Sequence, residues 1–141
     1  MKDILQFEPI QKFIRATGEE IKRYFGKDGS CIIYLKPNGT FYASALYEWL
    51  RPQKKNIELA TMEDDGDGLD EKKVMNRKVL LVDGEIVTGT AYRRSMEALR
   101  VKKSTLNIKD IKFASYIDRM GLADFSVWKY SPEAVWHLTE L

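Results

Sequence analysis

The fold class is decided by residues 79–91, which read VLLVDGEIVTGTA. The first four residues are an unbroken apolar run, as expected for a strand that is buried on both faces of a sheet. The segment from Asp83 to Thr90 is expected to be a loop. Tyr92, Met96 and Leu99 then mark one face of a helix. A strand, a loop and a helix in this order predict one unit of an α/β sheet.

The rest of the chain repeats this alternation. The acidic, glycine-bearing segment 63–68 is expected to be a loop. Together the segments predict an α/β fold, a mostly parallel twisted sheet flanked by helices, in one domain over residues 1–141. Helical spacing covers 10–25 and 41–50, and strand-like apolar runs cover 31–35, 57–62, 111–117 and 125–128.

Composition excludes several classes of protein. The chain has 141 residues, a formal net charge of +2, one cysteine and one histidine. A single Cys31 rules out an intramolecular disulfide, and a single His137 rules out a multi-histidine metal site. The opening residues do not resemble a signal peptide, and no apolar stretch is long enough for a membrane span. We therefore expect a cytoplasmic protein with no membrane partner, and the small net charge does not favour a nucleic-acid partner.

Residues 83–90 have the chemistry of an anion site. The amino end of a helix presents free backbone N–H groups and a positive dipole. Gly89 lets that backbone approach an anion closely, and Thr88 and Thr90 add hydroxyl donors. Asp83 lies where a carboxylate can accept from sugar hydroxyls or hold Mg²⁺. The alternative is a plain helix start with Thr88 as its N-cap and nothing bound.

These residues also resemble a known family. The run VLLVDGEIVTGTA resembles the phosphoribosyl-diphosphate signature of type I phosphoribosyltransferases. Residues 32–46, IIYLKPNGTFYASAL, resemble the first strand, diphosphate loop and following helix of the hypoxanthine-guanine branch. Residues 57–62 and 111–128 resemble further strands and the base-side region. The resemblance implies a type I phosphoribosyltransferase-like sheet with a small C-terminal hood.

The resemblance assigns roles by position. Asp83 would be catalytic, would contact the ribose hydroxyls and would bind the Mg²⁺ expected with phosphoribosyl diphosphate. The segment 63–76 would be a lid that shields the reaction from water. The other roles are 5′-phosphate binding by Thr88, Gly89, Thr90 and Ala91, diphosphate binding by Lys36, Pro37, Asn38 and Gly39, and base binding by Trp136 and Trp128.

Four positions depart from the family pattern. Gly84 replaces the second acid of the usual pair, and Glu85 would point to the other face of the strand from that position. Val87 stands where oxopurine enzymes carry an aspartate, and Ala91 replaces a hydroxyl. The lysine that reads the 6-oxo group falls near Leu122. Each change removes a polar contact, so the sequence supports the fold of this family more strongly than its enzymatic activity.

Two hypotheses follow. The chain transfers a 5-phosphoribosyl group from phosphoribosyl diphosphate to a nucleobase, with a purine preferred, in purine salvage. Alternatively it is a weak or inactive regulatory homologue that binds phosphoribosyl diphosphate or a nucleoside monophosphate. The family commonly forms homodimers, which we also expect here. Trp128 and Trp136 are also open to a packing role, and the basic residues after the phosphate loop to a solvated face or RNA binding.

Overall fold

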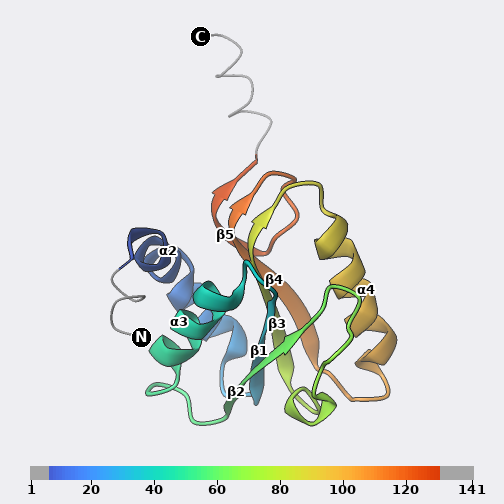
Figure 1. The fold of residues 1–141 in the computed structure, drawn as a ribbon. Helices are drawn as coiled ribbons and strands as arrows, with labels where there is room; N and C mark the ends of the chain where they lie inside the picture. Colours follow the sequence, from blue (N-terminus) through green and yellow to red (C-terminus); the bar gives the residue numbers. More distant parts are fainter. Residues whose placement is uncertain (1–6, 131–141) are drawn as a thin grey trace, which may run out of the picture.

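The computed structural model describes residues 7–130, in which five parallel strands form one sheet in the order β2-β1-β3-β4-β5 (Figure 1). This confirms the predicted α/β class. The part of a C-terminal hood that would fall on residues 131–141 lies outside the described residues. The helices are α2 (Glu8–Phe25), α3 (Thr40–Leu50) and α4 (Thr90–Lys103), with a 3-10 turn η1 (Glu71–Lys73); the strands are β1 (Ser30–Leu35), β2 (Ile57–Met62), β3 (Lys78–Ile86), β4 (Asp110–Asp118) and β5 (Phe125–Lys129).

The central strand β3 is covered on both faces. Val79 and Leu81 belong to the core on the α4 side, whereas Leu80 and Val82 belong to the core on the α2 and α3 side. All four side chains are fully buried. Figure 1 shows α2 and α3 on one side of the sheet and α4 on the other. Two-sided burial explains why this strand is a continuous apolar run rather than an alternating one. Within residues 7–130 no helix is both long and apolar enough to cross a membrane.

One boundary was predicted wrongly. The segment 83–90 was expected to be a loop, but β3 continues through Ile86. Its partner β4 is equally long and pairs with the extension, from Asp83 opposite Ser115 to Ile86 opposite Asp118. These inter-strand hydrogen bonds outweigh the poor strand propensity of the Asp-Gly pair.

The loop between β1 and α3 lies directly on β3. The Gly39 amide donates to the Leu35 carbonyl oxygen at 2.9 Å. A Cβ built on Gly39 would overlap the Val82 carbonyl oxygen, and a Cβ built on Gly84 would lie 2.9 Å from the Asn38 carbonyl oxygen. Both glycines are therefore required by close backbone approach, since real Cβ contacts are longer.

The segment after β2 packs along α4 and does not line the cavity at the carboxyl ends of the strands described below. Arg94 pairs with Asp64 at 3.3 Å, and a Cβ built on Gly66 would lie 2.9 Å from the Ala98 Cβ. Val74 is fully buried in the core. In this structure contacts with α4 hold residues 63–76 to one side of the cavity, and their closing over the site as a lid stays a prediction.

The connection between β4 and β5 is unusually short for two parallel strands, which commonly need a dozen or more residues. It spans residues 119–124. The buried Asp118 carboxylate accepts from the Met120 amide at 3.1 Å and from the Ala123 amide at 2.7 Å. Asp124 accepts from the Phe113 amide at 2.9 Å. The Asp118 carboxylate thus satisfies two amides of the turn, and the Asp124 carboxylate ties the end of the turn to an amide of β4.

We expect Gly39→Ala to lower the free energy of unfolding by roughly 2 kcal/mol, because the new methyl group must push the loop away from β3. Urea denaturation measures the change. Asn38→Ala is the matched control, since the Asn38 side chain is exposed and its backbone contact is retained. Equal stability of the two variants would contradict the close packing of this loop on the strand.

Candidate functional site

A cavity of about 200 Å³ opens at the carboxyl ends of β3 and β1, beside the start of α4. In open α/β sheets ligands bind at this edge. The structure brings together Asp83, the phosphate-loop residues and Asn38, which the sequence analysis assigned to one site. Its lining residues are Asn38, Asp83, Glu85, Ile86, Val87, Thr88, Gly89, Thr90, Ala91 and Tyr92.

The loop at the start of α4 has the geometry of an anion cradle. Gly89 is the N-cap, with φ of 85° in the left-handed region that favours glycine. The Thr88 and Thr90 hydroxyls lie 3.1 Å apart at the cavity. Thr88 is therefore not the N-cap, although its Oγ1 accepts from the Thr90 amide at 3.4 Å. The first amides of a helix have no intrahelical partner and remain available to a ligand.

The back of this loop is closed by two side chains. A Cβ on Gly89 would lie 3.0 Å from Leu122 Cδ1 and 3.3 Å from Arg93 Cζ. Arg93 also donates to the Thr88 carbonyl oxygen at 3.4 Å. Leu122, near which the base-reading lysine was expected, thus packs against the phosphate loop. Arg93 adds positive charge behind the cradle, a role that the sequence pattern did not indicate because Arg93 is one of several basic residues after the phosphate loop.

Asp83 lies on the floor of the cavity and is 8% exposed. Its Oδ1 accepts from the Gly84 amide at 2.8 Å. Burial raises the pKa of the carboxyl to about 6, with the Gly84 amide opposing the rise and the nearby Glu85 adding to it. Asp83 and Glu85 are two residues apart on one strand, so both side chains project from the same face.

The predicted diphosphate loop is only partly in the cavity. Lys36, Pro37 and Asn38 are exposed, and Gly39 is buried beneath them. Of the four, Asn38 alone lines the cavity. The peptide between Lys36 and Pro37 is cis. The loop borders the site from the β1 side, where its backbone packs against Val82 and Gly84 of β3.

The other side of the cavity carries an ion pair that the sequence analysis missed. Arg119 Nε lies 2.6 Å from Glu85 Oε1, and the Arg119 amide donates to the Ile86 carbonyl oxygen at 2.9 Å. The register places Glu85, Ile117 and Trp128 in one row across β3, β4 and β5. Trp128 is 57% exposed at the edge of the sheet. Trp136 lies outside the described residues. The position of Arg119 two residues after the strand predicted over 111–117 was the available signal.

No resident metal centre is built from the described residues: none of their His, Cys, Asp and Glu side chains gather in a group of three or more. The two acidic side chains that line the cavity are Asp83 and Glu85. This donor set fits a Mg²⁺ ion that arrives with a phosphorylated ligand, because Mg²⁺ is commonly held by one or two carboxylates together with substrate phosphates and water.

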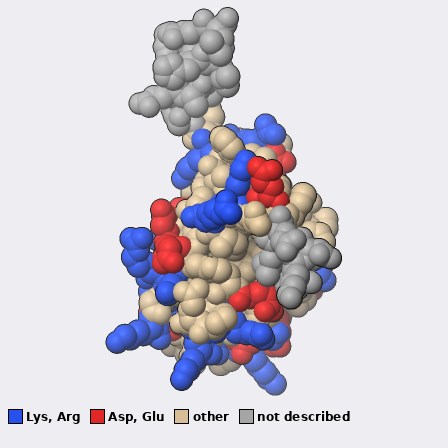
Figure 2. Space-filling view, turned by 90° about the vertical axis from the view of Figure 1, so that its left-hand side faces the viewer, with Lys and Arg blue, Asp and Glu red and all other residues tan. Residues whose placement is uncertain are grey.

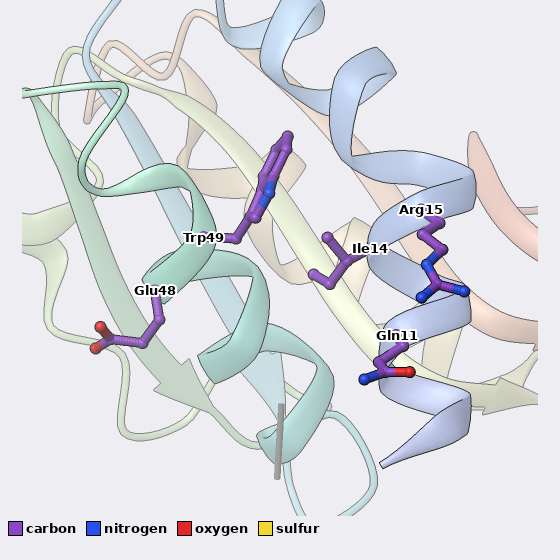
Figure 3. A pocket seen from close by; sticks show the side chains of 5 residues that line it. All are labelled: Gln11, Ile14, Arg15, Glu48 and Trp49. Atoms are coloured by element: carbon purple, nitrogen blue, oxygen red, sulfur yellow. The ribbon is translucent and has the colours of Figure 1, made fainter. Parts of the chain in front are cut away.

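A second hollow lies on the opposite side of the sheet. It has a volume of about 280 Å³, lies between α2 and α3, and contains no residue of the predicted site. Figure 2 views this side and shows a band of uncharged residues bordered by charged ones. The side chains that line the hollow, drawn in Figure 3, are Gln11, Ile14, Arg15, Glu48 and Trp49.

The comparisons with known proteins are consistent with this arrangement. No family model matches the chain, and no curated protein matches it in sequence. Solved structures do match. A hypoxanthine phosphoribosyltransferase from Staphylococcus aureus superposes with a TM-score of 0.69 and 16% identity, over 89% of this chain and 75% of that one.

Two further structures agree. A purine phosphoribosyltransferase from Pyrococcus horikoshii has a TM-score of 0.62 and 20% identity, over 89% of this chain and 85% of that one. A xanthine-guanine-hypoxanthine phosphoribosyltransferase from Helicobacter pylori has a TM-score of 0.57 and 15% identity, over 96% and 95% of the two chains. At these identities the likeness concerns the fold. The chain therefore has the type I phosphoribosyltransferase fold, in the form seen in the hypoxanthine enzymes.

Proposed function

We propose that this protein transfers a 5-phosphoribosyl group from phosphoribosyl diphosphate to a purine base and releases diphosphate. The observation that carries the proposal is the cavity at the strand ends, which Asp83 lines together with the hydroxyl-bearing residues Thr88 and Thr90 of the cradle. A phosphate monoester on the cradle would direct its sugar toward the carboxylate. The fold, shared with purine phosphoribosyltransferases, supports the same reading.

In this proposal the 5′-phosphate is bound mainly by the backbone at the start of α4. The free amides and the dipole at the start of α4 favour a dianionic group, and the threonine hydroxyls add donors. Arg93 stands behind the loop and adds a positive charge. Ala91 supplies no hydroxyl, but its amide belongs to the first turn of the helix. The loss of that one side-chain donor is therefore compatible with phosphate binding.

The ribose end rests on Asp83. When ionised, its carboxylate can accept from the 2′ and 3′ hydroxyls and stabilise the positive charge that develops on the sugar as diphosphate leaves. It would also hold the Mg²⁺ that accompanies phosphoribosyl diphosphate, an ion that neutralises the departing diphosphate. The loop 36–39, whose Asn38 lines the cavity, is the proposed neighbour of that diphosphate.

The base end rests on the row formed by Glu85, Ile117 and Trp128. Arg119 donors and Glu85 acceptors stand side by side, which suits the carbonyl and N–H edge of a 6-oxopurine. The exposed ring of Trp128 offers a stacking surface. Val87 cannot take a proton from the base, so catalysis would depend on positioning and charge stabilisation.

The transfer reaction is the first test. The purified chain is incubated with phosphoribosyl diphosphate, Mg²⁺ and each common purine or pyrimidine, and diphosphate release is measured. We expect turnover with at least one 6-oxopurine. Calorimetric binding of phosphoribosyl diphosphate without turnover for any base would instead support the regulatory alternative, and the absence of both binding and turnover would remove both functions.

The cradle is tested by replacing both hydroxyls in the double variant Thr88→Val and Thr90→Val. Affinity for a nucleoside monophosphate should fall roughly a hundredfold or more, since each of the two lost hydrogen bonds to a charged group contributes about 1.5–3 kcal/mol and about 1.4 kcal/mol is a factor of ten. Isothermal titration calorimetry gives the dissociation constant. Thr105→Val, at an exposed position in the turn after α4, is the control and should bind as the parent does.

Asp83→Asn should separate stability from function. The native state raises the carboxyl pKa to about 6, so it holds a proton that the unfolded chain releases near its ordinary value of 3.8. Ionised Asp83 therefore destabilises the fold increasingly as pH rises through this window. We expect the variant to be more stable by on the order of 2 kcal/mol at pH 8, to gain nothing at pH 3, and to lose turnover.

The pH-dependent part of that prediction is measured by urea denaturation at both pH values. Glu20→Gln serves as the control, because it removes one carboxylate at an exposed position of α2, on the opposite side of the sheet, and leaves the surroundings of Asp83 unchanged. A stability gain of Asp83→Asn that is the same at pH 3 and pH 8 would contradict the raised pKa.

Arg119→Ala is expected to raise the KM for the base by about tenfold and to leave the KM for phosphoribosyl diphosphate nearly unchanged, because it removes a donor at the base end alone. Steady-state kinetics with each substrate varied in turn measures the split. Lys103→Ala, at the far end of α4, is the control. An equal rise in both KM values would argue against a base-side role.

A further inference from the structure

The hollow between α2 and α3 has an ordered apolar floor. Ile14 comes from α2 and Trp49 from α3. A Cβ built on Gly18 would lie 3.0 Å from Trp49 Cζ3, so the indole ring packs against the α2 backbone where Gly18 has no side chain. Ile14 and Trp49 are each only half-buried. The floor is therefore a fixed aromatic and aliphatic surface that residues 7–130 leave partly open.

Opposite charges stand on the two sides of this floor. Figure 3 shows Arg15 on α2 and Glu48 on α3, with Ile14 and Trp49 between them. The two charged groups do not pair with one another within the chain. Glu48 pairs instead with Arg51 of the same helix at 3.6 Å, and such a pair on the surface contributes little. The hollow thus has one positive wall and one negative wall.

An exposed aromatic ring extends the apolar surface. Phe41 lies in the first turn of α3 and is 56% exposed. It precedes Glu48 by seven residues, and residues at this spacing share one face of a helix. The uncharged band in Figure 2 runs over this side of the molecule and is bordered by charged residues. An aromatic centre with a charged rim is the composition of a protein–protein interface.

The distribution of charge favours a second copy of this chain as the partner. In a two-fold dimer the same patch serves both copies, so that when one residue contacts another the reverse contact also forms. An axis that runs between α2 and α3, along the two helices, places α2 of one copy on α3 of the other. Arg15 of each copy then faces Glu48 of the other copy. A partner that carried one sign of charge would be repelled by one of the two walls.

We propose that α2 and α3 form the interface of a homodimer, in which the apolar floors of two copies pack together and Arg15 and Glu48 form two equivalent ion pairs between the copies. The apolar centre supplies affinity, and the charges fix how the copies are aligned. The hollow shares no residue with the cavity at the strand ends, so the inference does not depend on the proposed function.

The test is sedimentation velocity of the parent and of charge-reversal variants, with the parent expected to be a dimer. Arg15→Glu should raise the dissociation constant of the dimer roughly a hundredfold, because symmetry creates two like-charge contacts across the interface. Glu48→Arg should have the same effect for the same reason. The double variant, Arg15→Glu with Glu48→Arg, exchanges the two charges and should restore the dimer.

The matched controls lie on the opposite side of the sheet. Arg100→Glu and Glu97→Arg change the same charges at exposed positions of α4 and should leave the dimer unchanged. Phe41→Ser tests the apolar part and should raise the dissociation constant about tenfold. Trp49 is left intact in every variant because it packs on Gly18. Circular dichroism verifies that each variant is folded, which we expect because the replaced side chains lie on the surface.

Several results would overturn the proposal. One is a parent that remains monomeric up to about 1 mM, since a weaker dimer would not form at ordinary protein concentrations. Others are a dimer that neither charge reversal weakens, or one that the double variant fails to restore. Equal weakening by Arg100→Glu would show that net charge, and not this hollow, controls association. Assemblies that grow beyond a dimer would contradict the two-fold arrangement. A dimer without transfer activity would remove the proposed function alone.

Discussion

The pairing of β3 with β4 beyond Val82 is the constraint on which the site depends. β1 leaves the sheet at Tyr34, opposite Val82, whereas β4 follows β3 for four more residues. The extension is therefore paired with a strand on one side only, and the loop 36–39 packs against it where β1 ends. That asymmetry holds Asp83 and Glu85 on a rigid strand at the border of the cavity, and it sets the level at which the cradle of α4 begins.

The electrostatics of the cavity are divided between its two ends. The start of α4, with Arg93 behind it, attracts an anion. A few residues earlier on the chain, burial disfavours the charged form of Asp83. A cationic centre or a bound magnesium ion would reverse this penalty, since a nearby positive charge favours the carboxylate. Without such a positive charge, the buried Asp83 carboxylate lowers the stability of the fold at neutral pH.

The absence of a second acid has a structural counterpart. Gly84 lies under the Asn38 backbone, at a distance that leaves no room for a side chain. The loop 36–39 occupies the space that a larger residue would need. A side chain at position 84 would collide with the loop, so an acidic residue there is incompatible with the observed loop conformation. Gly84 is therefore required by the way the loop packs on β3. Glu85, paired with Arg119, provides the second negative charge on the same face as Asp83.

Much of the architecture was determined by local sequence patterns. Apolar runs marked β1, β2 and β3, and helical spacing marked α2, α3 and α4, because these periods reflect which faces are buried. Residues 83–91 identified the cradle through short-range chemistry. The tertiary structure alone decided where β3 ends and where residues 63–76 pack. It also decided that Arg119 pairs with Glu85 and that Ser115 lies opposite Asp83. Each of these features depends on which strand or helix lies alongside. Contacts between residues that are distant along the chain produce no periodic pattern in the sequence, so the sequence could not predict them.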